Sequence, residues 1–362
     1  MLSVASMNDP IQILTLADAN YFLGLRVTAL SMAIFAKDPS RLVFNVIDGG
    51  IQESQQQDLE RRLQEVHPQI QVRFIQPAEK WFQDFPAYKG NKLTYSRLFL
   101  PDIFPDMGKI LFCDSDTLWL APVEDLWSLM QKDDAIVAVK DPMDATRESE
   151  NSWFEQNGLE PPGEAYFCAA IAMLNLKWMR AHRVIERAGV FVAAYPDLRF
   201  ADQTIMNHLM RGHVCDMPTY LHTISRTEHR GSLDLPRTLH YAGELPWVRT
   251  TRSGTISDME MIWHHFSDLA IYGKQGASLA QLYPRHQIWL KRFIFKLNAI
   301  PAIRCVFQFL GQKVLRLNDA SLEKLLYVNP IERSAIKKVF KTIETTTDRR
   351  CKLSPRIQLT SD

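Results

Sequence analysis

The stretch Ile110-Leu111-Phe112-Cys113-Asp114-Ser115-Asp116-Thr117-Leu118-Trp119-Leu120 places two carboxylates in the middle of an apolar run. On an extended chain, residues i and i+2 point to the same side, so Asp114 and Asp116 can reach one cation together. Mg²⁺ and Mn²⁺ are hard divalent ions that bind both carboxylates and phosphate oxygens. Because open α/β sheets bind ligands at the carboxyl ends of their strands, this stretch predicts a metal and phosphate site there. The alternative interpretation is a turn rich in Asp and Ser that follows a strand.

The segments on both sides of this stretch alternate between strand and helix patterns. Strands are predicted at 11–16, 42–47, 70–75, 109–113, 135–139, 167–176 and 214–217. Helices are predicted at 22–36, 55–66, 94–100, 123–131, 177–188, 202–210 and 259–266. This order indicates an α/β fold with a mixed, mainly parallel sheet flanked by helices. Residues 144–164 are polar and contain Gly and Pro, which predicts a loop.

The composition is that of an ordinary globular protein, with 362 residues, 46% hydrophobic and 23% charged. A net charge of +1 gives no global field that would attract nucleic acid. The five cysteines are widely spaced and form no C-x-x-C pair, which favours a reducing compartment and argues against a zinc ribbon. Residues 1–10 lack the features of a signal peptide and no apolar run is long enough to span a membrane, so we expect a cytoplasmic or peripheral protein.

The character of the chain changes after Tyr272, and we expect an α/β domain over residues 10–272, a basic amphipathic helical region over 273–344 and a disordered tail over 345–362. The segment Arg285–Asn318 contains seven Lys or Arg residues and no Asp or Glu, with aromatic and aliphatic residues between them. Such a segment suits peripheral contact with an anionic membrane, here the inner face. A helical subdomain that packs on the core and exposes a basic face explains the pattern equally well.

Further polar residues come where predicted strands end. Asp18 follows the first strand, Asp141 follows the strand at 135–139, and His240 comes late in the chain. Histidine is a common ligand beside carboxylates, and Gly243 would let the backbone approach a phosphate closely. A lone His before an aromatic residue is also a frequent core residue.

These motifs, taken in order, resemble glycosyltransferase family 8, the group that contains glycogenin and the bacterial lipopolysaccharide galactosyl- and glucosyltransferases. The matching landmarks, over roughly residues 11 to 266, are Ala17-Asp18-Ala19-Asn20-Tyr21, Tyr95-Ser96-Arg97-Leu98, Asp114-Ser115-Asp116, Asp141-Pro142, Tyr166-Phe167-Cys168-Ala169-Ala170, Leu174-Asn175-Leu176, Asp202-Gln203 and His240-Tyr241-Ala242-Gly243. A D-x-D triplet alone recurs by chance, whereas eight landmarks in family order are specific. The resemblance implies a GT-A (Rossmann-like) fold, followed here by a helical C-terminal extension.

The resemblance also implies roles for individual residues. The ligands of Mn²⁺ or Mg²⁺, which bridges the diphosphate of a UDP-hexose, would be Asp114, Asp116 and His240. Donor-binding residues would be Asp18, Asn20 and Tyr21 at the uracil and ribose, with Arg97, Ser115 and Gly243 nearer the sugar and phosphates. The sugar and acceptor end would be lined by the candidate catalytic residues Asp141, Asp202 and Gln203. An amide is a poor nucleophile, so we expect Gln203 to position groups and stabilise charge.

The activity implied is retaining transfer of glucose or galactose from a UDP-sugar to a saccharide or glycolipid acceptor, in the synthesis of lipopolysaccharide or another surface glycan. Two departures from the family pattern weaken the expected donor contacts. Cys168-Ala169-Ala170 stands where the family has Asn-Ala-Gly or Asn-Ser-Gly, and Leu245 stands before Pro246 where the family has a Lys. Losing a charge-assisted contact to phosphate costs about 1.5–3 kcal/mol. The basic residues that could replace the Lys are Arg249, Arg252 and Lys274.

Two other function classes remain as alternatives. The departures are typical of a catalytically inactive relative that binds sugars or nucleotides. A haloacid-dehalogenase-like phosphatase also carries D-x-D after an apolar strand, but at the start of its core and with Thr or Val two residues later, where this chain has Leu118.

Overall fold

The structure is a computed structural model that describes residues 9–88, 90–225, 233–243, 245–247, 258–272 and 333–352. The chain divides into two compact units. The first comprises Met1–Ile224, Pro236–Ala242 and Arg349–Asp362, and the second comprises Ser225–Leu235 and Gly243–Asp348.

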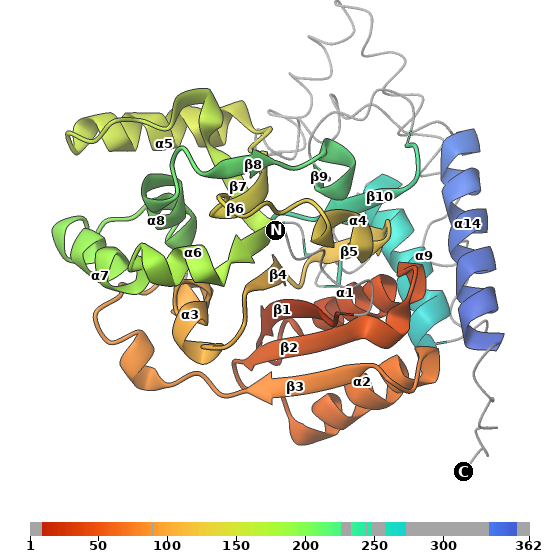
Figure 1. Cartoon of the computed structure of the whole chain (residues 1–362). Helices are drawn as coiled ribbons and strands as arrows, with labels where there is room; N and C mark the ends of the chain where they lie inside the picture. Colours follow the sequence, from red (N-terminus) through yellow and green to blue (C-terminus); the bar gives the residue numbers. More distant parts are fainter. Residues whose placement is uncertain are drawn as a thin grey trace, which may run out of the picture. The chain divides into compact units, whose positions relative to one another are not determined.

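A seven-stranded sheet in the order β3-β2-β1-β4-β7-β6-β8 forms the core of the first unit (Figure 1). Its strands are β1 Ile11–Ala17, β2 Leu42–Asp48, β3 Gln71–Ile75, β4 Lys109–Cys113, β6 Ile136–Lys140, β7 Phe167–Asn175 and β8 Val214–Asp216. The run from β3 to β4 is parallel, β7 is antiparallel to both β4 and β6, and β8 is parallel to β6. The predicted mixed, mainly parallel sheet is confirmed.

Burial along the strands follows their place in the sheet. Every residue of β2 and β7 is buried, as expected for inner strands covered on both faces, whereas β3 at the edge is partly exposed. Strand β4 is buried from Ile110 to Cys113, so the apolar half of the stretch that carries the two carboxylates lies in the core. Asp114 and Asp116 therefore follow directly after a buried strand of the sheet.

The helices of the first unit connect these strands. They are α1 Phe22–Phe35, α2 Glu53–Val66, α3 Leu100–Ile103, α4 Val123–Trp127, α5 Asp144–Gln156, α6 Leu176–Ala181, α7 Val184–Ala194 and α8 Asp202–Leu209. Short 3₁₀ helices cover Pro39–Arg41, Glu79–Trp81, Leu93–Leu98, Gly163–Ala165 and Thr219–Leu221. The helix predicted at 177–188 is divided between α6 and α7, because Arg183 adopts a left-handed conformation with φ of 52°. The helix predicted at 94–100 is a 3₁₀ helix followed by α3.

The loop predicted over 144–164 is wrong for its first part, which is helix α5. Polar residues dominate this helix, but Glu150, Trp153 and Phe154 gather on one face and are buried. The indole Nε1 of Trp153 donates a hydrogen bond to the carbonyl of Asp197 at 2.7 Å. The tertiary packing of a few large side chains thus stabilises this helix, although its sequence shows little periodicity of apolar residues.

A second, three-stranded sheet in the order β5-β10-β9 lies in the same unit. It is made of β5 Thr117–Leu120, β9 Thr223–Ile224 and β10 Arg237–His240. Strand β10 pairs antiparallel with β5, placing His240 opposite Thr117, and parallel with β9, placing His240 opposite Ile224. This small sheet joins the end of the carboxylate stretch to a part of the chain that is remote in sequence.

Two helices are described in the remainder of the chain, α9 Asp258–Tyr272 and α14 Arg333–Lys352. Helix α9 confirms the helix predicted at 259–266 and is longer. The disordered tail expected from residue 345 is wrong for residues 345–352, which continue α14. The reason is a buried stripe at helical spacing, formed by Ile336, Val339, Ile343 and Thr347.

Within the second unit, the ring of His265 in α9 stacks on Phe340 in α14 with centroids 4.0 Å apart. The basic segment Arg285–Asn318 and residues 353–362 lie outside the described residues. Among the helices that are described, none combines the length and the apolar content needed to cross a membrane.

Candidate functional site

The loop between β4 and β5 carries both predicted carboxylates, and hydrogen bonds fix it at several points. The N–H of Asp114 donates to the carbonyl of Ala170 in β7 at 2.8 Å, and the N–H of Tyr241 donates to the carbonyl of Asp116 at 2.9 Å. The hydroxyl of Thr117 donates back to the carbonyl of Asp114 at 3.1 Å. The loop is therefore held by strands from both sheets.

Helix α1 anchors the same loop from another side. The buried hydroxyl of Thr28 donates to the carbonyls of Ser115 and Thr117, at 3.1 and 2.8 Å. One turn later, the hydroxyl of Ser31 accepts the N–H of Trp119 at 3.0 Å. Two hydroxyl residues three apart on a mainly apolar helix were a signal in the sequence for such an anchor, and our sequence analysis missed it.

An irregularity in β7 supplies further contacts. The pairing of β6 with β7 shifts between Ala138 and Val139, whose partners are Ala172 and Cys168. Residues 169–171 thus form a bulge toward the carboxylate loop, a feature common beside active sites. Ala170 accepts the N–H of Asp114, and Ala169 contacts two further polar side chains described below.

Asp114, Asp116 and His240 come together as the sequence predicts. One ligand atom from each lies within 4.8 Å of the other two, and Nε2 of His240 is 3.4 Å from Oδ1 of Asp116. His240 reaches this place because it ends β10, opposite Thr117. Two carboxylates and one imidazole form a donor set that suits Mn²⁺, and less strictly Mg²⁺.

The charged groups of this cluster shift one another's pKa values. Desolvation raises the pKa of Asp114 to about 6; Arg97 opposes this shift, and the Asp116 carboxylate adds to it. Burial alone would lower the pKa of His240, but Asp116 and Cys168 outweigh it and hold that pKa well above its ordinary value. Oδ1 of Asp116 is buried and makes no hydrogen bond among the described residues, its neighbour being the His240 ring. A cation at this point would satisfy that oxygen and offset the carboxylate charges.

Arg97 links the metal-ligand candidates to the predicted catalytic carboxylate. Its guanidinium lies 3.2 Å from Oδ1 of Asp114 and 2.6 Å from Oδ2 of Asp202, and it donates to the carbonyl of Ala169 at 2.9 Å. The same group stacks over the ring of Phe112, 3.8 Å from the centroid. Arg97 is only 5% exposed, so these contacts replace the water that the guanidinium gives up.

Asp202 and Gln203 begin helix α8, directly after Ala201, which has the unusual φ of 49°. The Asp202 carboxylate is buried and also accepts a hydrogen bond from Thr94. Burial raises its pKa, with Arg97 and Thr94 opposing the shift. The strained backbone before α8 sets the direction in which these two side chains leave the helix.

The amide of Gln203 is fixed at both ends. Its oxygen accepts the N–H of Ala169 at 2.9 Å, and its nitrogen donates to the hydroxyl of Tyr166 at 2.8 Å. Beyond Tyr166 lies Glu150 in α5, a fully buried carboxyl group. Burial raises the pKa of Glu150 to about 7, partly offset by the hydroxyl groups of Thr204 and Tyr166. Sequence analysis missed Glu150 because it lies in the segment predicted as a loop.

Asp141 follows β6 and is almost fully buried. Its Oδ1 accepts the N–H of Met143 at 2.9 Å, and its N–H donates to the carbonyl of Tyr166 at 2.9 Å. Burial raises its pKa, opposed by Met143, Arg147 and His240 in that order.

The residues that leave β1 form a tight turn. Oδ1 of Asp18 accepts the N–H groups of Asn20 and Tyr21, at 2.9 and 3.0 Å, so this carboxylate shapes its own turn. Burial and then the carboxylates of Asp116, Asp18 and Asp114 raise the pKa of Tyr21. Gly243 belongs to the second unit and has a φ of 67°. The basic residues Arg249, Arg252 and Lys274 lie outside the described residues.

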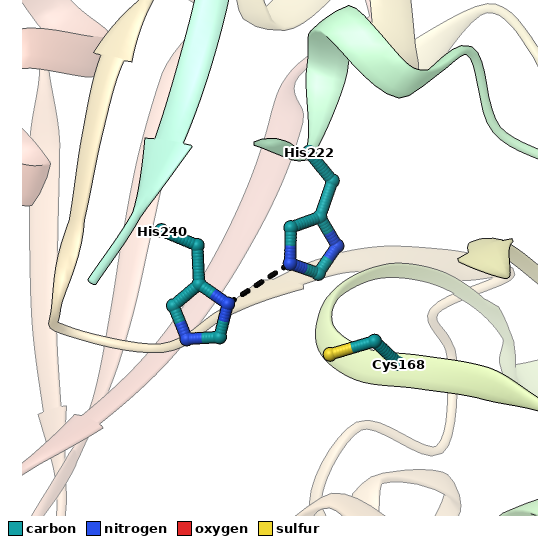
Figure 2. Close-up of side chains that lie close together, drawn as sticks. All are labelled: Cys168, His222 and His240. Carbon is teal, nitrogen blue, oxygen red and sulfur yellow. Dashed lines mark hydrogen bonds between the residues drawn. The ribbon is translucent and has the colours of Figure 1, made fainter. Parts of the chain in front are cut away.

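A second group of potential ligands adjoins the first and consists of Cys168, His222 and His240 (Figure 2). Nε2 of His222 lies 3.0 Å from Nδ1 of His240, and all three residues are buried. Sequence analysis missed His222, because it precedes the two-residue strand β9, which is recognised by its pairing with β10.

Comparison with known proteins adds an independent finding. Residues 12–251 match the model of Glycosyl transferase family 8. A protein of Haemophilus influenzae, whose name places it among the glycosyltransferases, is 27% identical over 147 residues, which make up 40% of this chain and 43% of that protein. Glucoside xylosyltransferase 1 of Gallus gallus is 49% identical over 39 residues, 11% of this chain and 9% of that protein. The match thus spans less than half the length of either curated relative.

Solved structures share the fold. The galactosyltransferase LgtC, solved with donor and acceptor sugar analogs, has a TM-score of 0.59 and 24% identity, covering 75% of this chain and 99% of that one. The bifunctional glycosyltransferase WbbM has a TM-score of 0.57 and 20% identity, covering 77% of this chain and 52% of that one. At these identities the likeness concerns the fold, and it confirms the GT-A type expected from the sequence.

Proposed function

The chain belongs to glycosyltransferase family 8, and from this premise we propose that it transfers a hexose from a UDP-sugar to a saccharide acceptor with retention of anomeric configuration. The observation that carries the proposal is the cluster of Asp114, Asp116 and His240 at the carboxyl end of β4. Two oxygen donors and one nitrogen donor fit Mn²⁺ or Mg²⁺, and the buried Oδ1 of Asp116, which accepts no hydrogen bond from the described residues, would gain a partner in a coordinated cation. A cation bound there supplies Lewis-acid stabilisation of the diphosphate that leaves the sugar.

We assign the other contacts with the UDP-sugar to residues near the cluster. The uracil and ribose are assigned to the β1 exit turn, because Asp18 holds that turn rigid. Ser115 stands between the two carboxylates in the sequence and is assigned to the donor phosphates. Arg97 keeps Asp114 in position and can turn part of its guanidinium toward the donor when the cation neutralises that carboxylate.

Gln203 and Asp202 hold the reacting end of the donor in this proposal. The Gln203 amide has a fixed orientation between Ala169 and Tyr166, so it serves as a preorganised dipole for the charge that develops on the sugar ring. The acceptor hydroxyl then attacks on the face from which the diphosphate leaves, and Asp141 and Asp202 line the acceptor side.

The donor sugar is proposed to be glucose or galactose. Galactose is supported by the fold shared with LgtC, which is named as a galactosyltransferase. Because of the short match to a glucoside xylosyltransferase, a pentose donor is tested beside the two hexoses. The acceptor proposed is a growing lipopolysaccharide or another bacterial surface glycan. An assay of UDP release with UDP-glucose, UDP-galactose and UDP-xylose would separate the donors.

The first test is calorimetric titration of UDP into the purified protein with and without Mn²⁺. We expect binding that needs Mn²⁺ and that weakens at least about tenfold in Asp116→Ala. The matched control is Asp106→Ala, which removes an exposed carboxylate. A UDP affinity that is the same with and without Mn²⁺, and the same in Asp116→Ala as in the native protein, would overturn the proposed site.

A second candidate function is that of an inactive relative that binds UDP-sugars without transferring them. Cys168 favours it, because a buried thiol stands where the family supplies an amide to the donor sugar. Metal-dependent UDP binding without UDP release, under any donor and acceptor, would select this candidate. The family match removes the phosphatase interpretation.

A further inference from the structure

A thiol and two imidazoles meet beside the carboxylate cluster but on the other side of the His240 ring. Cys168 comes from the bulged part of β7, His222 precedes β9, and His240 ends β10. They are 6%, 2% and 4% exposed, and one ligand atom of each lies within 4.8 Å of the other two. Figure 2 shows Sγ of Cys168 pointing toward the two rings, and Nε2 of His222 facing Nδ1 of His240 at 3.0 Å.

The chemistry of this group differs from that of its neighbour. Sulfur and imidazole nitrogen are donors that favour Zn²⁺ over Mg²⁺ and Mn²⁺, which prefer oxygen. Tetrahedral Zn²⁺, with bonds of about 2.0–2.1 Å to nitrogen and about 2.3 Å to sulfur, holds its ligand atoms roughly 3.3–3.6 Å apart. The two imidazole nitrogens, 3.0 Å apart, are near this spacing, and the thiol lies within 4.8 Å of them, so a small side-chain adjustment would bring all three into one coordination sphere. Because three ligands leave the fourth position of a tetrahedron open, water or a small anion would complete it.

An ordinary hydrogen-bonded pair of buried histidines would account for the imidazoles alone. It does not account for the thiol, which points toward both rings. Among the described residues, the one hydrogen bond of the His222 ring is the one to His240, because its other nitrogen, Nδ1, is buried without a partner.

We propose that Cys168, His222 and His240 form a second metal site, which binds Zn²⁺ and shares His240 with the carboxylate pair. On binding, the thiol loses its proton to solvent, and Nδ1 of His240 and Nε2 of His222 present lone pairs to the ion. Nε2 of His240 then keeps its proton and faces Asp116 as a donor, consistent with their separation of 3.4 Å.

The shared residue makes the two cations competitors, a consequence that rests on the proposed function. A neutral imidazole has one lone pair for a metal, so His240 serves either Nε2 to the carboxylate site or Nδ1 to the thiol site. Zn²⁺ at the thiol site therefore withdraws one ligand from the cation that would hold UDP. The enzyme would be switched off by a metal different from the one that activates it.

The site is tested with Co²⁺, which occupies Zn²⁺ sites and shows a sulfur-to-metal charge-transfer band in the near ultraviolet. We expect this band in the full-length protein, its displacement by Zn²⁺, and its loss in Cys168→Ser. The matched control is Cys215→Ser, which removes a half-buried thiol on β8 and should leave the band unchanged. His222→Gln should weaken Co²⁺ binding at least about tenfold while keeping the thiol, and it reports on the site independently if Cys168→Ser folds poorly.

Absence of the band in the native protein, or its persistence in Cys168→Ser or at full strength in His222→Gln, would overturn the thiol site. The competition is tested separately by titrating UDP in the presence of Mn²⁺, with and without Zn²⁺. We expect Zn²⁺ to weaken UDP binding at least about tenfold in the native protein and less than about twofold in Cys168→Ser. A Co²⁺ band without any effect of Zn²⁺ on UDP would refute the sharing of His240 alone. A Co²⁺ band in a protein that never binds UDP would refute the proposed function and leave the Zn²⁺ site standing.

Discussion

Arg97 joins two carboxylates that the sequence separates widely, and its contacts explain why a guanidinium is needed there. One edge of the group pairs with Asp202 and the other reaches Asp114, while its face covers Phe112. A Lys ammonium is a single point of charge and cannot serve both carboxylates while covering the ring.

We expect Arg97→Lys to lower the free energy of unfolding by about 2–4 kcal/mol, because one buried carboxylate loses its partner. Urea unfolding at neutral pH would measure the change. Arg61→Lys, on the exposed side of α2, is the control and should cost less than about 0.5 kcal/mol. Equal effects of the two substitutions would show that the buried pairing contributes little.

Glu150 is a second residue whose burial has a measurable consequence. Burial raises its pKa from 4.5 to about 7, so the folded protein holds this proton after the unfolded chain has lost it. Its contribution to stability is therefore complete below about pH 4.5 and is lost as the pH rises to about 7, a change of about 3 kcal/mol.

We expect Glu150→Gln, which stays neutral, to be as stable as the native protein at about pH 5 and more stable by about 1–3 kcal/mol at about pH 8. Urea unfolding at several pH values would show the difference directly, since all other titrating groups are common to both proteins. The exposed Glu155→Gln in the same helix should shift stability by less than about 0.5 kcal/mol at either pH. Parallel stability curves for Glu150→Gln and the native protein would contradict the raised pKa.

At the scale of elements, helix α1 does more than cover the sheet, because its Thr28 holds the loop that carries the carboxylates. We expect Thr28→Val to lower the free energy of unfolding by about 1–3 kcal/mol, since it leaves the carbonyls of Ser115 and Thr117 buried without donors. The same substitution should weaken Mn²⁺-dependent UDP binding by loosening the loop. Both effects can be followed by urea unfolding and calorimetry.

Thr238→Val is the matched control for this experiment. Thr238 is also fully buried, but its hydroxyl has no hydrogen-bond partner among the described residues, so Val should be neutral or stabilising there. If Thr28→Val proved as harmless as Thr238→Val, helix α1 would have no part in shaping the site.

The individual helices and strands also show which parts of the fold could be predicted from the sequence. Strands such as β2 and β4 were predictable because their continuous apolar runs can only be buried. Helix α5 was not predictable, because it is stabilised by three large side chains that pack in the tertiary structure. Strand β9 was not predictable either, because it consists of two residues that pair with β10. His222 depends on β9 for its position, so the thiol site could not be found before the fold was known.

At the scale of the whole molecule, the order of motifs predicted the fold and the convergence of Asp114, Asp116 and His240, because the family pattern fixes which strand ends meet. The pairing of Arg97 with Asp202 was not predictable, since it depends on the strained turn at Ala201 and on the bulge in β7. The resemblance assigned Arg97 to the donor, and this role stays a prediction; the structure adds its contacts with Asp114 and Asp202.

The basic segment Arg285–Asn318 gives a prediction that concerns the molecule as a whole. We expect the protein to float with vesicles that contain an anionic lipid and not with neutral vesicles, and to detach as salt is raised. Replacing Lys291, Arg292 and Lys296 by Glu should abolish this binding. The exposed Lys80 and Lys132 replaced by Glu serve as the control. Equal flotation of both variants would favour the alternative of a packed helical subdomain.

The place of β10 in the chain has a consequence for how the protein is made. The carboxylates of Asp114 and Asp116 leave the ribosome with β4 and β5, whereas His240 follows only after β6, β7, β8 and β9 have been synthesised. Since nascent domains fold from their N-terminal part onward, a growing or prematurely terminated chain can form the parallel half of the sheet without the imidazole. If the proposed site binds its cation, metal capture is a late event in biogenesis, and incomplete translation products carry the acidic pair without the full set of proposed ligands.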